Sequence, residues 1–84
     1  MKVVFTGSAR KTLRRLPGDR RTQIVARIEA VATGAAPNLD VKRLAGSNLH
    51  RLRVGEYRVL FVIDPEAQIL RVELIRTRGD VYKR

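Results

Sequence analysis

Three closely spaced arginines give this chain its clearest chemistry. Arg51 and Arg53 lie two residues apart, and Arg58 follows Gly55-Glu56, a dipeptide that suits a two-residue turn. If a hairpin turns there, Arg53 pairs with Arg58, and all three guanidinium groups share one face because faces alternate along a strand. Guanidinium groups bind phosphate oxygens through paired hydrogen bonds. The spacing therefore predicts a phosphate-facing surface, and a solvated face with a local ion pair is the alternative.

A carboxylate farther along the chain can offset part of this charge. A four-residue connection after the third strand places Glu73 beside Arg58 and Arg71 beside Leu60. Like charges opposite each other in a sheet are destabilising. Glu73 can neutralise one arginine but not all three, and a slip of one residue would exchange the two faces.

The C-terminal residues add a second basic cluster with one aromatic ring. Arginine combined with tyrosine suits RNA, because guanidinium groups bind phosphates and a phenol ring stacks on a base. The segment can fold back beside the third-strand arginine; a frayed basic tail is the alternative. The members of this cluster are Arg76, Arg78, Tyr82, Lys83 and Arg84.

Other kinds of site lack the residues they need. His50 is the only imidazole, and alternation places it with Leu52 and Val54 toward the helices, so we expect it to pack. Cysteine is absent and the carboxylates do not cluster, so we expect no metal and no cofactor. Ser8 has no His or Asp arrangement to activate it as a nucleophile.

The first half of the chain has the pattern of a strand and two helices. Residues 2–6 are rich in β-branched and aromatic side chains, which favours a strand. Two apolar stripes of helical spacing follow, separated by a turn at Pro17-Gly18. Ser8 and Asp19 are the expected N-caps, and Gly34 the expected left-handed end of the second helix. The stripes are Ala9, Leu13 and Leu16, and then Ile24, Ile28 and Val31.

The second half of the chain changes to a period of two. Strands are expected at residues 49–54, 57–63 and 68–75, with short turns that favour an antiparallel meander. Residues 35–40 are expected to form a loop. The order β-α-α-β-β-β predicts an α+β domain in which a helical hairpin packs on one face of a small antiparallel sheet.

Composition limits the kinds of partner. The 84 residues suit one domain, and 18 Lys and Arg against 8 Asp and Glu give a net charge of +10. Such a charge attracts polyanions, so nucleic acid, a ribosome or an acidic protein are candidate partners, with a merely solubilising surface as the alternative. We see neither a signal-peptide pattern nor an apolar run of ~20 residues, and expect a soluble cytoplasmic protein.

Two segments resemble the RelE branch of the RelE/ParE toxin superfamily. They are LHRLRVGEYRVLF at residues 49–61 and RGDVY at residues 78–82, and the resemblance extends over residues 1–84 as one RelE-like domain. It implies a toxin of a type II toxin–antitoxin system that enters the ribosomal A site and cleaves mRNA. A ribose 2′-hydroxyl would attack the adjacent phosphate without a metal. The implied partners are the ribosome with its mRNA and a cognate acidic antitoxin.

The resemblance also implies which residues act. The implied catalytic residues are Arg51, Arg53, Arg58, Arg78 and Tyr82, with Arg76 as an alternative to Arg78. The implied RNA-binding residues are Arg51, Arg53, Arg58, Arg71, Arg76, Arg78, Lys83 and Arg84.

Two departures from the family pattern bear on catalysis. Family members often carry a lysine pair at the positions of Arg51 and Arg53, and arginine cannot serve as a general base because it keeps its proton. Tyr82 and then His50 are the remaining candidates for that role. Thr77 stands where relatives often carry histidine. Cleavage is then weak, dependent on alignment by the ribosome, or lost.

Two other functions stay open at this point. One is a non-catalytic inhibitor of a target such as DNA gyrase, as in the ParE branch, and the other is a small basic RNA-binding protein. An antitoxin is expected to dock in an apolar groove between the helical hairpin and the sheet, near Leu13, Leu16 and Ile24.

Overall fold

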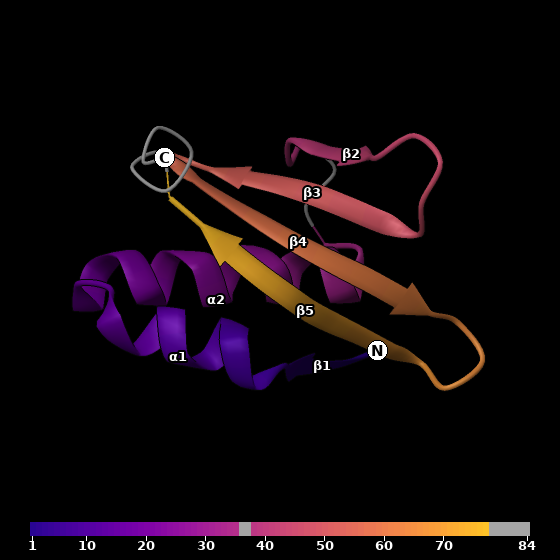
Figure 1. Cartoon of the computed structure of the whole chain (residues 1–84). Coiled ribbons are helices and arrows are strands. Elements are labelled where there is room, and N and C mark those ends of the chain that lie inside the picture. The colour runs from indigo at the N-terminus through magenta and orange to yellow at the C-terminus, as the bar shows by residue number, and fades with distance from the viewer. Residues whose placement is uncertain (36–37, 78–84) are drawn as a thin grey trace.

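The computed structural model of the chain describes residues 1–35 and 38–77, which form two helices packed on one face of a five-stranded sheet (Figure 1). The predicted α+β class and helical hairpin are confirmed. In chain order the elements are β1 (Lys2–Phe5), α1 (Gly7–Arg15), α2 (Gly18–Thr33), β2 (Val41–Arg43), β3 (Leu49–Val54), β4 (Tyr57–Asp64) and β5 (Ile69–Arg76).

The sheet has the strand order β1-β5-β4-β3-β2. Strands β3, β4 and β5 form the predicted antiparallel meander. Two features differ from the expected sheet. Residues Val41–Arg43 add an edge strand, β2, antiparallel to β3, and β1 pairs in parallel with β5, so the sheet is mixed. A parallel pair needs a long connection, and most of the chain lies between these two strands.

The core lies between the helices and one face of the sheet. The apolar stripe of α2 contributes Ile24, Ile28 and Ala32, and α1 contributes Ala9. Leu13 and Leu16 are partly buried and pack against this cluster. The helix-facing side of the sheet supplies the other buried residues: Leu52, Val54, Val59, Phe61, Leu70, Val72 and Ile75.

Two of the three predicted helix ends differ in the structure. Thr6, not Ser8, caps α1, because the helix begins directly after β1 and the Thr6 hydroxyl accepts a hydrogen bond from the Ala9 amide at 3.1 Å. Pro17 occupies the N-cap of α2 without a side-chain bond, and Asp19 lies in the first turn, where a carboxylate favours the helix dipole. Gly34 ends α2 in the left-handed conformation with a φ of 71°, as predicted.

The first hairpin has the predicted register. Val54 pairs with Tyr57 and Arg53 with Arg58 across the Gly55-Glu56 turn. Gly55 has a φ of 58°, a conformation that glycine adopts without the steric cost that other residues pay.

The second hairpin does not have the predicted register. Arg58 pairs with Arg76 and Leu60 with Leu74, whereas we expected Glu73 and Arg71 at those positions. The turn closes at Asp64 and Ile69, and one additional residue in β5, Glu73, forms a β-bulge between the Leu60–Leu74 and Phe61–Val72 pairs. Among the described residues, no helix is long and apolar enough to cross a membrane.

Candidate nucleic-acid interface

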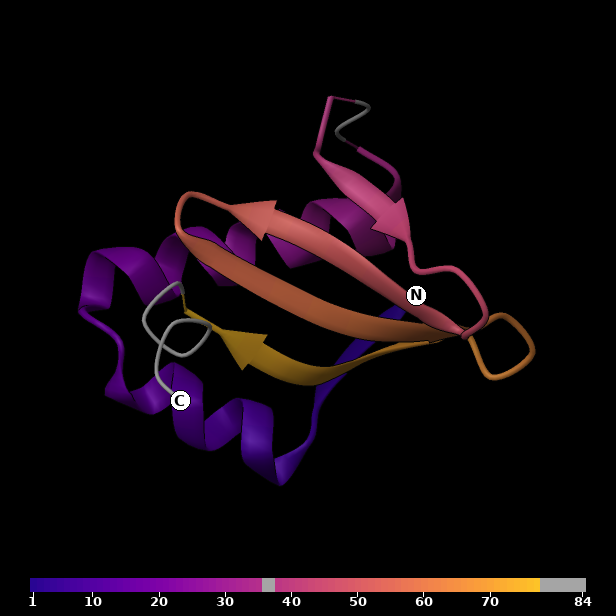
Figure 2. The same cartoon turned by 45° about the horizontal axis from the view of Figure 1, so that its top comes forward.

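The side of the sheet turned away from α1 and α2 is here called the open face. No described helix covers it (Figure 2). Alternation from the buried positions and the strand registers place fourteen side chains on it. They are Lys2 and Val4 from β1; Lys42 from β2; Leu49, Arg51 and Arg53 from β3; Arg58, Leu60, Val62 and Asp64 from β4; and Ile69, Arg71, Leu74 and Arg76 from β5.

Three arginines cross the open face in one row. Arg53 pairs with Arg58, and Arg58 pairs with Arg76, on three neighbouring strands. Side chains that face each other in this way have Cβ atoms about 5 Å apart. All three arginines are exposed, and within residues 1–35 and 38–77 none has an ion-pair partner. We call Arg53, Arg58 and Arg76 the arginine row; it can hold several oxygens of one phosphate or of neighbouring phosphates.

Arg51 lies in the next row of the open face and is partly neutralised. It pairs with Leu60 on one side and with Lys42 on the other. Its Nη2 contacts the Asp40 carboxylate at 3.3 Å, and its side chain is 22% exposed. Its Nε is buried without a hydrogen-bond partner in the described part of the chain. Arg51 is therefore a half-buried cation that Asp40 fixes in place, next to the exposed arginine row on β3.

A group of aliphatic side chains lies beside these cations. Leu49, Leu60, Val62 and Leu74 are each half-buried on the open face. Apolar side chains of this kind can contact the flat surface of a nucleobase while neighbouring guanidinium groups bind its phosphate. The open face thus combines cations with an apolar surface, and none of its described residues has an aromatic ring.

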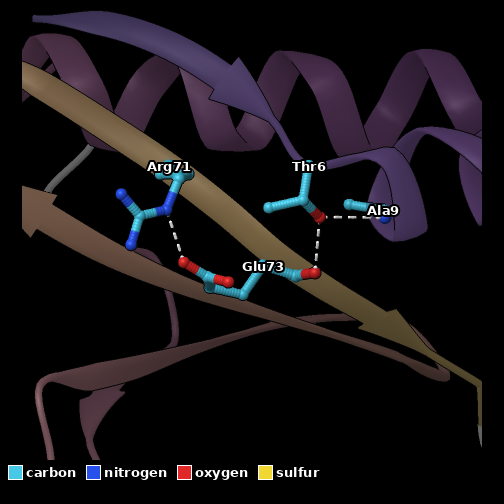
Figure 3. A network of polar contacts seen from close by, with 4 residues as sticks. All are labelled: Thr6, Ala9, Arg71 and Glu73. Carbon is cyan, nitrogen blue, oxygen red and sulfur yellow. Dashed lines mark hydrogen bonds and ion pairs between the residues drawn. The ribbon is translucent and has the colours of Figure 1, made fainter.

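Arg71 lies at the other end of the open face and is ion-paired. It is opposite Val62, four residues along β4 from Arg58, a separation of about 13 Å. Its Nε donates to the Glu73 carboxylate (Figure 3). Glu73 therefore neutralises Arg71, and our expectation that it neutralises Arg58 is wrong, because the turn closes at Asp64 and Ile69 and so shifts Glu73 away from Arg58.

His50 lies on the opposite side of the sheet from the arginine row. It pairs with the buried Phe61, and the two rings stack with centroids 5.2 Å apart and planes 15° apart. The expectation that this histidine packs is confirmed. Because His50 is on the helix-facing side, it cannot act as a general base on RNA bound at the open face.

Lys42 is the open-face residue that the sequence patterns did not reveal. The three residues of β2 are all exposed and show no apolar alternation, so nothing indicated a strand there. The register of β2 with β3 places Lys42 next to Arg51. A lysine amine can lose a proton, which arginine cannot, so this position offers chemistry that the arginine row lacks.

The remaining predicted site residues lie outside the described part of the chain. These are Arg78, Tyr82, Lys83 and Arg84, whose roles stay predictions. Among residues 1–35 and 38–77, no three His, Asp or Glu side chains lie in a group that could hold a metal ion.

Comparisons with known proteins agree on one family. Residues 3–82 match the model of the ParE toxin of the type II toxin–antitoxin system parDE. Toxin RelE3 of Methanocaldococcus jannaschii is 35% identical over 80 residues, covering 90% of this chain and 91% of that protein. The chain also resembles the structure of a RelB–RelE antitoxin–toxin complex from Methanococcus jannaschii. There the TM-score is 0.75 and the identity 26%, with 94% of each chain covered. The isolated Escherichia coli RelE toxin shares the fold, with a TM-score of 0.76 at 21% identity over 96% of this chain and 89% of that one.

Proposed function

Because the chain belongs to the RelE/ParE family of type II toxin–antitoxin toxins, we propose that it is a ribosome-dependent endoribonuclease that cleaves mRNA. The observation that supports this most is the arginine row on the open face, where three cations without a described ion-pair partner lie side by side. Like charges held together in this way destabilise a sheet, and a bound phosphate offsets that cost. A ribosomal target places this activity in the cytoplasm.

The proposed reaction is a transfer within the RNA backbone, for which the protein supplies charge and a base while the ribosome aligns the RNA. The ribose 2′-oxygen forms a bond to the adjacent phosphorus, the bond from phosphorus to the 5′-oxygen breaks, and a cyclic phosphate remains. The 2′-hydroxyl proton passes to a base, and the 5′-oxygen takes up a proton. Arg53, Arg58 and Arg76 would stabilise the charge that develops on the phosphate, the dominant contribution in reactions of this kind.

Two residues are proposed as the proton acceptor in place of the family's lysine pair. Tyr82 is the first, from the resemblance of the C-terminal segment to relatives. Lys42 is the second, because it lies on the open face beside Arg51. Alignment of the 2′-hydroxyl by the ribosome would lower the demand on either group.

An acidic antitoxin is the proposed protein partner. Structures of related toxins include RelE–RelB complexes from Pyrococcus horikoshii and Escherichia coli. The net charge of +10 and the uncovered open face favour an acidic segment that lies across the arginine row. The alternative groove near Leu13, Leu16 and Ile24 is less suitable than we expected, because Ile24 is fully buried in the core. Failure to co-purify with the product of an adjacent small acidic gene would count against this partner.

A second candidate function is inhibition of DNA gyrase without catalysis. The family model that matches this chain is that of the ParE toxin. The lysine pair of RelE-like relatives is replaced here by Arg51 and Arg53. The open face would then bind an acidic protein surface in place of RNA.

The experiment that separates these functions is primer extension on a defined mRNA. Purified protein is added with and without ribosomes that carry an empty A site. Cuts within A-site codons that appear only with ribosomes support the endoribonuclease. Growth arrest by a protein that produces no cuts would contradict it, and gyrase supercoiling would then be measured.

A further inference from the structure

We infer that Thr6 is a positioning residue for the arginine row: its hydroxyl holds the β-bulge at Glu73 and thereby keeps Arg76 on the open face. This inference rests on the proposed function for its consequence in RNA binding. The geometric part stands on the contacts of Thr6 alone.

Thr6 lies where three elements meet. Strand β1 pairs with β5 as far as Phe5 and Val72, and the Thr6 amide donates to the Val72 carbonyl at 3.0 Å. The chain then turns into α1, so no backbone amide of β1 is left for the next carbonyl of β5. The Thr6 hydroxyl donates to that carbonyl, Glu73 O, at 2.8 Å (Figure 3). The same oxygen accepts from the Ala9 amide, so one side chain both caps α1 and binds the bulge.

The bulge decides which face receives the end of β5. Before it, Leu70 and Val72 alternate into the core; after it, Ile75 is in the core and Arg76 is exposed. Without the additional residue, alternation would continue from Val72 to Leu74 and would turn Arg76 toward the helices. The pairing of Arg76 with Arg58 therefore depends on Glu73 being left without a partner on β4.

On the β4 side, Glu73 is skipped by the residue pairing. Glu73 has no Cα partner on β4, and its side chain is engaged with Arg71 on the same strand. Among the contacts described for Glu73, its carbonyl bond from Thr6 is the one that joins the bulge to another element. Loss of the Thr6 hydroxyl leaves the Glu73 carbonyl without this partner. It also removes a contact that stabilises the bulged register relative to a regular one.

Three substitutions separate the two tasks of the Thr6 hydroxyl. Thr6→Ser keeps both the helix cap and the donor. Thr6→Asp keeps the cap, because a carboxylate accepts from the Ala9 amide, but it has no proton to donate to Glu73 O. Thr6→Val keeps the shape and loses both bonds.

The first measurement is the register of β4 and β5, by cross-strand NOEs between Arg58 and Arg76 and between Leu60 and Leu74. These NOEs should persist in Thr6→Ser and weaken or disappear in Thr6→Asp, although the Asp variant keeps its helical signal. Native NOEs in Thr6→Asp would overturn the inference. Loss of the NOEs in Thr6→Val but not in Thr6→Asp would assign the effect to the cap and would overturn it too.

The second measurement is binding of a short single-stranded RNA over a range of salt concentrations. Displacement of Arg76 removes one phosphate contact, so Thr6→Asp should reduce the salt slope of log K by about 0.7, with Thr6→Ser unchanged. Changed NOEs with unchanged RNA binding would preserve the role of Thr6 in the register and contradict the RNA-binding function of the arginine row. The two failures are thus distinguishable.

Discussion

Arg58 is the middle member of the arginine row, with Arg53 on one side and Arg76 on the other. Its position is unfavourable for the folded protein alone, because like charges that face each other repel. We expect Arg58→Gln to leave Tm unchanged or to raise it, while affinity for single-stranded RNA falls by about tenfold through loss of a charged phosphate contact. Thermal unfolding and RNA titration measure the two effects.

The matched control for Arg58 is Arg20→Gln, an exposed position on α2 that removes the same unit of charge. RNA affinity should be nearly native in this variant. An equal loss of affinity in both variants would mean that net charge alone, and not the arginine row, attracts RNA.

Lys42 is the open-face residue whose role in proton transfer can be tested most directly. If its amine accepts the 2′-hydroxyl proton, Lys42→Arg should keep RNA binding and lower single-turnover cleavage on ribosomes by about 10²-fold. Lys42→Met should lower binding as well, because its charge is gone. Native cleavage in Lys42→Arg would exclude Lys42 as the base, leaving Tyr82 as the remaining proposal.

At the scale of elements, one guanidinium group forms hydrogen bonds between the end of α1 and α2. Nη1 of Arg21 donates to the carbonyls of Arg14 and Leu16 at 3.4 and 3.3 Å, which binds the end of α1 to the first turns of α2. We expect Arg21→Met to lower the free energy of unfolding by about 1 kcal/mol. The neighbouring Arg20→Met should leave it nearly unchanged, and urea denaturation measures both. Equal stability of the two variants would show that the Arg21 bonds contribute nothing.

The two hairpins show how far a sequence pattern fixes an element. Gly55-Glu56 leaves only two residues between β3 and β4, so the turn determines the register, and the prediction that Arg53 faces Arg58 is confirmed. The register of β4 and β5 was wrong by three residues: the turn closes at Asp64 and Ile69, which shifts the pairing by two, and the bulge adds one residue that no turn pattern reveals. A signal was present in Leu74-Ile75, two adjacent apolar residues that break the alternation of β5.

Other differences between prediction and structure arose where the position of an element depends on its neighbour and not on its own sequence pattern. Ser8 has the chemistry of an N-cap, but β1 ends at Phe5, so the helix begins earlier and Thr6 takes that role. Strand β2 is three exposed residues long, and only its pairing with β3 makes it a strand. Lys42 was missed for this reason, whereas the co-facial placement of Arg51, Arg53 and Arg58 followed from alternation alone.

For the whole molecule, folding and RNA binding should respond to salt in opposite directions. A net charge of +10 on 84 residues gives self-repulsion that salt screens, and only two ion pairs are described within residues 1–35 and 38–77. Tm should therefore rise when sodium chloride increases from ~0.02 to ~0.3 M. RNA affinity should fall over the same range, because bound RNA releases its counterions.

The size of the salt effect on binding tells which side of the molecule meets RNA. Five open-face cations lack a described ion pair (Lys2, Lys42, Arg53, Arg58 and Arg76), and the C-terminal segment adds Arg78, Lys83 and Arg84. At about 0.7 per contact, these give a slope of log K against log salt between about −3.5 and −5.6 for single-stranded RNA. A slope steeper than about −7 would require the cations of α1 and α2 to bind RNA too, and a slope near −1 would contradict an open-face interface. Arg58→Gln should make the slope less steep by about 0.7, and Arg20→Gln should leave it unchanged, because Arg58 is on the open face and Arg20 lies on α2, which is not expected to contact phosphate.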